Sequence, residues 1–275
     1  LTPDTSCIFQ TDELARQYSE LQQAVLSRTG FFLVTGDVGV GKTLLTRDVV
    51  SHLPADFKVL RLQRSSHTPE HLKALLARFL GMEKLVKGTD FLSYVEAQLS
   101  KRLLAGRRTL LVVDEAQNLD FDTLELLRCL GNIENNEAKA LSVLFVGQTE
   151  FIARLSKIDL RQLMQRMVCH IHLGPLPTES VEEYILFRLR TKGVRPDLFD
   201  KSAIRAIKAM SNGVPREVNR LCDAAARAAA REGEARVSGR IVKALGLADA
   251  SQALTRSSRT KYLSLVVLFS VALLS

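Results

Sequence analysis

The stretch FFLVTGDVGVGKTLLTRDVV, residues 31–50, decides the fold of this 275-residue chain. It begins with an apolar run typical of a buried strand, turns through three glycines, and continues with a helical pattern from about Lys42 to Leu53. The turn between Gly36 and Thr43 fits the pattern G-x-x-x-x-G-K-[ST]. A strand before that pattern and a helix after it are the context it requires. The stretch therefore predicts a phosphate-binding loop.

Each part of this loop has an expected role in binding ATP. The glycines let the backbone curl so that its N–H groups point at phosphate oxygens, and the helix N-terminus adds a favourable dipole. Lys42 is expected to contact the β- and γ-phosphates, and Thr43 to ligate Mg²⁺. The expected nucleotide-binding residues of the loop are Gly36, Asp37, Val38, Gly39, Val40, Gly41, Lys42, Thr43 and Leu44.

A second apolar run, residues 108–113, ends in the acidic pair Asp114 and Glu115. In a sheet that holds a phosphate loop, Asp114 would lie beside that loop and hold Mg²⁺ through water. Glu115 would polarise the attacking water as a general base. The pair favours hydrolysis over phosphoryl transfer to a metabolite, and the sequence has no N-K-x-D motif that would indicate a GTPase.

Four further polar residues are candidates for nucleotide-dependent chemistry. Gln148 ends an apolar run, where an amide can orient water and sense the γ-phosphate. Arg161 and Arg166 are candidates for a cation that reaches the γ-phosphate of a neighbouring subunit and stabilises transition-state charge. Arg216 begins a helix of the second domain and would contact the nucleotide from a lid. Exposed positions with no catalytic role remain the alternative for each of the four.

Apolar runs that alternate with helical patterns predict an α/β fold, namely a P-loop parallel sheet with helices on both faces. The two prolines of GPLPTES, residues 174–180, indicate a boundary, and the pattern beyond it is only helical. Ser180 and Glu183 are expected to form a capping box, and residues 124–134 to be helical. The predicted organisation is an ATPase domain over 1–175, a helical lid over 176–247, a linker over 248–260 and the start of a transmembrane helix over 261–275.

Composition limits the partners. The net charge is +8 with a pI of about 9.5, which suits nucleic acid, an anionic membrane surface or simply a solvated surface. Aromatic residues make up only 6% and Trp is absent, so no rich base-stacking platform is apparent. The four cysteines are far apart and contain no CxxC pair, which predicts neither a metal site nor a disulfide framework.

The end of the sequence indicates a membrane. The run YLSLVVLFSVALLS, residues 262–275, is apolar but shorter than the ~20 residues that cross a bilayer. We interpret it as the first part of a transmembrane helix that continues past Ser275. The preceding Arg256, Arg259 and Lys261 would hold residues 1–260 on the cytoplasmic side of a bacterial inner membrane, in a single-pass topology.

Several segments together resemble one family. TGDVGVGKT, LLVVDEAQNL, VLFVGQTEF, LRQLMQRM and SNGVPREVNRLCDAA are similar to the ExeA-type AAA ATPases of the general secretion pathway and to the related mannose-sensitive pilus ATPases. The resemblance runs from about Pro3 to Leu247. It implies an ATPase core, a helical lid, one membrane-spanning helix and often a periplasmic peptidoglycan-binding part, which these residues do not include. The family commonly has GQPEL where this chain has Thr149 in place of proline.

We therefore expect an oligomeric, membrane-anchored AAA ATPase that uses Mg·ATP to drive assembly of a secretion or pilus machine with an inner-membrane partner protein. A DNA-binding AAA ATPase, such as a transposition target-selection regulator, is the alternative and would use the positive charge. The apolar tail counts against it, so nucleic acid is the less favoured partner. A third possibility is a scaffold that binds ATP and barely hydrolyses it.

Overall fold

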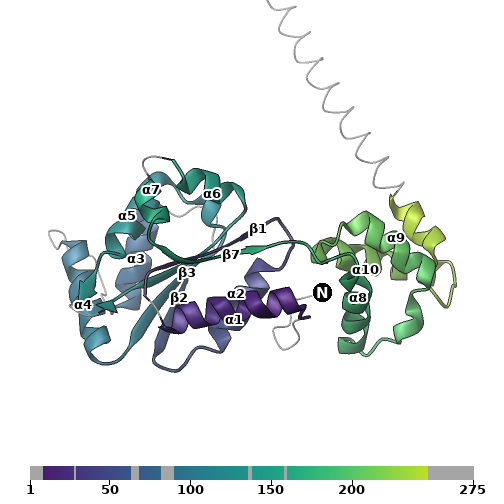
Figure 1. Cartoon of the computed structure of the whole chain (residues 1–275), viewed down its shortest axis with the longest axis horizontal. Helices are drawn as coiled ribbons and strands as arrows, with labels where there is room; N and C mark the ends of the chain where they lie inside the picture. The colour runs from purple at the N-terminus through teal and green to yellow at the C-terminus, as the bar shows by residue number, and fades with distance from the viewer. Residues whose placement is uncertain are drawn as a thin grey trace, which may run out of the picture. The chain divides into compact units, whose positions relative to one another are not determined.

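The computed structural model describes residues 9–27, 29–62, 68–81, 90–135, 138–157 and 160–246. The chain divides into two compact units, Leu1–Gly174 and Pro175–Ser275, each described here by itself (Figure 1). The predicted linker and the apolar tail, residues 248–275, lie outside the described residues. Among the residues that are described, no helix is long and apolar enough to cross a membrane.

The first unit is built on a five-stranded parallel sheet with the order β2-β3-β6-β1-β7. Parallel strands need crossover connections, and here helices supply them, as the alternating pattern predicts. The fold class of the first unit, an α/β P-loop sheet, is therefore as expected. The strands are β1 Phe31–Gly36, β2 Phe57–Leu62, β3 Arg108–Val113, β6 Ser142–Val146 and β7 Met167–Leu173.

Helices cover both faces of this sheet (Figure 1). Phe32 and Val34 of β1 pack into the core under the first two helices, whereas Phe31 and Leu33 pack into the core on the opposite face. Burial on both faces explains why the strands read as continuous apolar runs. The helices on the first face are α1 Asp12–Ser27 and α2 Lys42–Ser51; those on the second are α3 Pro69–Phe79, α4 Phe91–Leu104, α5 Phe121–Leu130, α6 Glu150–Leu155 and α7 Arg161–Met164.

The second unit is helical in its described part. Its elements are α8 Ser180–Thr191, the 3₁₀ turn η3 Pro196–Leu198, α9 Lys201–Ser211, α10 Pro215–Arg231 and a helix over 239–246. Gly213 links α9 to α10 with a φ of +73°. A Cβ at this position would lie 2.1 Å from the carbonyl oxygen of Leu176. The connection therefore requires glycine, both for its φ and for its lack of a side chain.

Two local predictions are wrong. The helix expected over 124–134 ends at Leu130, because Gly131 lies against the Phe31 ring and the chain then enters the short antiparallel pair β4 Glu134–Asn135 and β5 Ala138–Lys139. The capping box is absent from α8: Ser180 is already helical, and the cap position Glu179 makes no side-chain cap hydrogen bond. By contrast, α3 has a side-chain cap: Thr68 at its N-cap position accepts a hydrogen bond from the His71 N–H.

Candidate nucleotide-binding site

The phosphate loop connects the carboxyl end of β1 to α2, as the sequence predicts. Gly36 closes the strand with a φ of +149°, and a Cβ there would lie 2.2 Å from the carbonyl oxygen of Leu173 at the end of β7. Gly41 is the N-cap of α2 with a φ of +110° and provides no side-chain cap. The loop therefore passes tightly between two strand ends and opens directly into a helix N-terminus.

This helix start fits a phosphate group. The first N–H groups of an α-helix have no intrahelical acceptor, and other helices satisfy them with a capping side chain. Gly41 has none to offer, and a Cβ added to it would meet no atom within 4 Å, so the space beside the cap is open. Residues 38–44 would hold the phosphates of ATP through these N–H groups, where the helix dipole also favours an anion.

Lys42 is folded back onto the loop. Its Nζ donates hydrogen bonds to the carbonyl oxygens of Gly36 and Asp37, each at 2.8 Å. Burial lowers the pKa of Lys42 from its ordinary value, while the carboxylates of Glu115 and Asp114 oppose that shift. The lysine ammonium thus lies on the loop, within the electrostatic influence of the acidic pair, and its contact with the phosphates stays a prediction.

The acidic pair lies beside the loop because β3 ends where α2 begins. Thr43 Oγ1 donates a hydrogen bond to Asp114 Oδ2 at 3.2 Å, and the Glu115 N–H donates to Asp114 Oδ1 at 3.0 Å. Hydroxyl and carboxylate oxygens are ligands that Mg²⁺ prefers. Thr43 and Asp114 are therefore the residues that would hold the ion, and when bound it would neutralise charge on the phosphates.

Glu115 is distinguished by its backbone and by its partner. It has a left-handed conformation with a φ of +52°, uncommon outside glycine. Its Oε2 accepts a hydrogen bond of 2.5 Å from Nε2 of Gln117, and Oε1 of Gln117 accepts one of 3.1 Å from the Gln148 N–H. Glu115 and Gln148, both expected site residues, are thus brought together through a residue that was not among the candidates.

Sequence reasoning missed Gln117 and also Arg61. Gln117 stands two positions after Glu115, and its polarity next to a strand end was the available signal. Arg61 lies at the end of β2, close enough to Asp114 for the two charges to interact; burial and the nearby Arg47 lower the pKa of Arg61, whereas Asp114 raises it. In the sequence, an isolated arginine within an apolar strand gives no indication that Asp114 will lie nearby.

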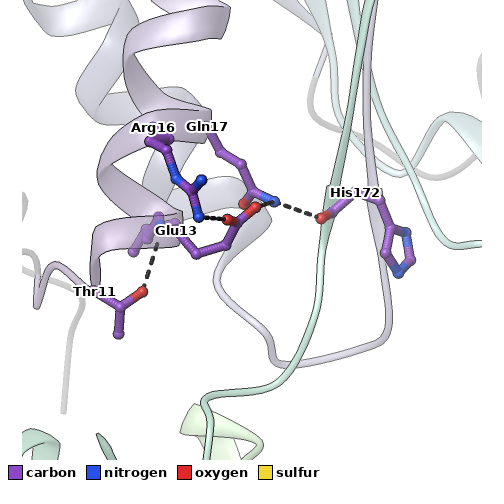
Figure 2. Close-up of polar contacts among 6 residues, drawn as sticks. Thr11, Glu13, Arg16, Gln17 and His172 are labelled. Atoms are coloured by element: carbon purple, nitrogen blue, oxygen red, sulfur yellow. Dashed lines mark hydrogen bonds and ion pairs between the residues drawn. The ribbon is translucent and has the colours of Figure 1, made fainter.

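The end of β7 next to the loop is held by α1. Gln17 Nε2 donates to the carbonyl oxygen of His172 at 3.1 Å, and Glu13 accepts a second hydrogen bond from the same amide (Figure 2). On the neighbouring strand β1, the hydroxyl of the buried Thr35 lies 2.8 Å from Nε2 of His170 and 3.2 Å from Nδ1 of His172, both on β7. Burial, with a contribution from His172, lowers the pKa of His170.

Arg161 and Arg166, the two candidate arginines of the first unit, do not join this cluster. The Arg166 carbonyl lies beside Gly30, and Met167 pairs with Phe31, at the amino end of β1. The phosphate loop follows the other end of that strand, five residues or about 17 Å away. Arg161, exposed at the start of α7, belongs to the same region. Arg216 is exposed in the first turn of α10, in the second unit.

Comparisons with known proteins match the part of the chain that carries this candidate site. The AAA domain family matches residues 24–155, which include the loop and the acidic pair. The chain is 32% identical over 239 residues to general secretion pathway protein A of Aeromonas hydrophila, covering 86% of this chain and 44% of that protein. It thus spans less than half the length of the curated relative it matches. The resemblance to the ExeA-type family is confirmed.

Solved structures show the same fold at low identity. Cdc6p of Pyrobaculum aerophilum superposes with a TM-score of 0.63 at 17% identity, covering 84% of this chain and 65% of the other. A Walker-type ATPase of Pyrococcus abyssi gives 0.57 at 18%, covering 94% and 80%. The RuvB branch migration motor of Thermotoga maritima gives 0.54 at 19%, covering 85% and 67%. These structures place the described chain in the AAA-type P-loop fold.

Proposed function

Because this chain carries an AAA-type ATPase domain similar to general secretion pathway protein A, we propose that it hydrolyses ATP to drive assembly of a secretion or pilus machine in the bacterial cell envelope. The observation that carries the proposal is the 32% identity over 239 residues. That length exceeds the first unit, which ends at Gly174, so the similarity extends into the helical unit as well. The relative's name supports the role in secretion, and the phosphate loop with the acidic pair supports ATP hydrolysis.

The proposed chemistry uses this chain's own groups in separate roles. The N–H groups of the loop and Lys42 bind and orient the phosphates, and Thr43 with Asp114 holds Mg²⁺. Glu115 accepts a proton from the attacking water. Asp114 stays fixed meanwhile by the Glu115 N–H and the Thr43 hydroxyl, both within 3.2 Å of its carboxylate oxygens. Metal binding and water activation therefore fall to different carboxylates.

The proposal includes an oligomer and a membrane anchor. Arg166 lies about one strand length from the loop of its own chain, which supports its action on a neighbouring protomer's nucleotide. The basic residues before the tail and the apolar run after them support a single-pass anchor in the inner membrane, with residues 1–260 cytoplasmic. An inner-membrane protein of the same machine is the proposed partner, and Arg216 the proposed nucleotide contact from the lid.

The experiment replaces the chromosomal copy with a Glu115→Gln variant in the source bacterium. Secretion through the general pathway, or pilus number, is measured together with the amount of assembled envelope complex. We expect the variant protein at normal levels in the membrane fraction, with assembly lost. Normal assembly with an inactive ATPase would contradict the proposal. A Glu96→Gln variant, changed on an exposed position of α4, is the matched control.

A DNA-binding ATPase is the second candidate, favoured by the net charge of +8. It makes a separate prediction. Contacts between lysine or arginine and phosphate release counterions, so DNA binding would weaken steeply as salt increases. Duplex DNA titrated against the protein with and without ATP, between low and physiological salt, separates the two candidates. Strong, salt-dependent binding that ATP modulates would favour the DNA-binding function over envelope assembly.

A further inference from the structure

The side chain of Gln117 joins two parts of the candidate site that come from different strands. Its Nε2 donates to Glu115 Oε2 at 2.5 Å, after β3, and its Oε1 accepts from the Gln148 N–H at 3.1 Å, after β6. We propose that Gln117 is a positioning residue that fixes the Glu115 carboxylate and couples it to the strand end at Gln148. This inference rests on the proposed ATP hydrolysis and names the group that regulates it.

Gln117 is itself held in place. It lies in the 3₁₀ turn η1 Ala116–Asn118, whose first residue is fully buried. Its carbonyl oxygen accepts a hydrogen bond of 2.9 Å from Nη1 of Arg154 on α6. A Cβ added to Gly147 would lie 3.2 Å from the amide oxygen of Gln117, so the neighbouring strand end passes close to the side chain. Gln117 is thus held at its backbone carbonyl and at both the nitrogen and the oxygen of its side-chain amide.

The glutamine amide is complementary to both partners. Glu115 offers an acceptor and the Gln148 backbone offers a donor, and a glutamine side chain provides the complementary donor and acceptor together. A hydrogen bond to a charged group is worth about twice a neutral one, so the contact to Glu115 is the stronger of the two. That contact matters because the Glu115 backbone is left-handed and its side chain is exposed, with little packing to orient it.

The second hydrogen bond, from the Gln148 N–H, links the position of Gln117 to the strand end next to the nucleotide site. Gln148 follows β6, which lies between β3 and β1 in the sheet, and β1 leads into the phosphate loop. Any displacement of the Gln148 backbone by bound phosphate pulls on the Gln117 amide and so changes where it holds the Glu115 carboxylate. The position of the Glu115 carboxylate therefore depends on the state of the nucleotide, through the side chain of Gln117.

The test compares Gln117→Ala and Gln117→Glu with the wild type. Gln117→Glu keeps an acceptor for the Gln148 N–H but replaces the donor to Glu115 with a second carboxylate. We expect both variants to bind Mg·ATP within about twofold of wild type and to lose at least about tenfold in kcat, because a displacement of 1 Å can lower a rate about 100-fold. Asn118→Ala, in the same turn and exposed, is the control and should keep the wild-type kcat.

Two readouts separate positioning from a general structural effect. In Gln117→Glu alone, the acid limb of the pH–rate profile should move to higher pH, because two adjacent carboxylates resist being ionised together. In a Glu115→Gln background, Gln117→Ala should cause no further loss of kcat, since the residue it positions has been removed.

The outcomes decide between the two proposals. An additive loss in the double variant, or an unchanged kcat and pH profile in Gln117→Glu while the wild type is active, overturns the role of Gln117 and leaves the ATPase proposal in place. A wild type that does not hydrolyse ATP overturns both. Loss of kcat with retained nucleotide binding, a shifted acid limb and non-additivity together support the inference.

Discussion

Thr43 and Asp114 are 71 positions apart in the sequence, yet the threonine hydroxyl donates a hydrogen bond of 3.2 Å to the aspartate carboxylate. The contact joins the first turn of α2 to the end of β3. It places the two oxygen ligands expected of Mg²⁺ side by side and positions the next residue, Glu115, at the edge of the phosphate loop.

Lys42→Ala should bind ATP about 10- to 100-fold more weakly, because a charge-assisted hydrogen bond to the phosphates is lost. Hydrolysis should be lost with it. Nucleotide affinity is measured by isothermal titration with a non-hydrolysable ATP analogue. Lys101→Ala, which removes an exposed lysine of α4, should bind as the wild type does. Wild-type affinity in Lys42→Ala would refute the assignment of the loop.

Glu115→Gln should bind Mg·ATP normally and hydrolyse it about 10²- to 10⁴-fold more slowly, because the general base is lost while the metal ligands remain. Asp114→Asn should instead need more Mg²⁺ to reach half-maximal binding. Magnesium titrations and single-turnover hydrolysis are measured for both. If the two variants show the same defect, metal binding and water activation are not divided between these carboxylates.

Arg166→Ala should bind ATP nearly normally and hydrolyse it ~10³-fold more slowly if the arginine acts on a neighbouring protomer. Mixed with inactive Lys42→Ala, it should regain activity, because some interfaces then combine an intact loop with an intact arginine. Activity of the mixture should rise with protein concentration and fall on dilution. A mixture that stays inactive while light scattering shows mixed oligomers would exclude a shared site at Arg166; the same measurement on Arg161→Ala tests the second candidate.

Gly213→Ala should destabilise the helical unit more than Gly233→Ala. Both glycines have a left-handed φ, +73° and +71°, so both variants carry a backbone cost of about 1–2 kcal/mol. Only at Gly213 does the new Cβ meet a backbone atom, the Leu176 carbonyl oxygen at 2.1 Å, whereas Gly233 has open space. The difference in the free energy of unfolding, from urea denaturation, isolates the steric effect. Equal values would mean that the turn at Leu176 adapts without cost.

His170→Gln should make the free energy of unfolding less dependent on pH below neutrality. The pKa of His170 is lowered in the folded protein, first by burial and then by His172, so the unfolded chain binds the proton more tightly. Stability is therefore lost as pH falls from above the unfolded value of about 6.5 to the lower folded pKa. Denaturation curves between pH 5 and 8 measure this slope. His71→Gln, at the exposed start of α3, is the control and should leave the slope unchanged.

Much of the first unit could be predicted because its signals are local. The loop, the acidic pair and the apolar runs that precede them are short patterns whose meaning depends on neighbours within a few residues, and the structure has strands at both runs. The predictions that fail are also local, but they depend on contacts from elsewhere. The helix expected to continue to Glu134 is stopped where Gly131 meets Phe31, a residue 100 positions earlier.

The sequence by itself determined the chemistry of this site: a cation and a hydroxyl at the start of a helix, and two carboxylates after the end of a strand. Only the tertiary structure decided which of its polar residues work together. Strand order brings β3 and β6 side by side, and Gln117 can bridge Glu115 and Gln148 only because those strand ends are adjacent. The same geometry separates Arg166 from its own loop by the length of β1. Hydrogen bonds form at donor–acceptor distances of about 3 Å. The spacing of residues along the sequence does not show which residues of different strands lie that close together.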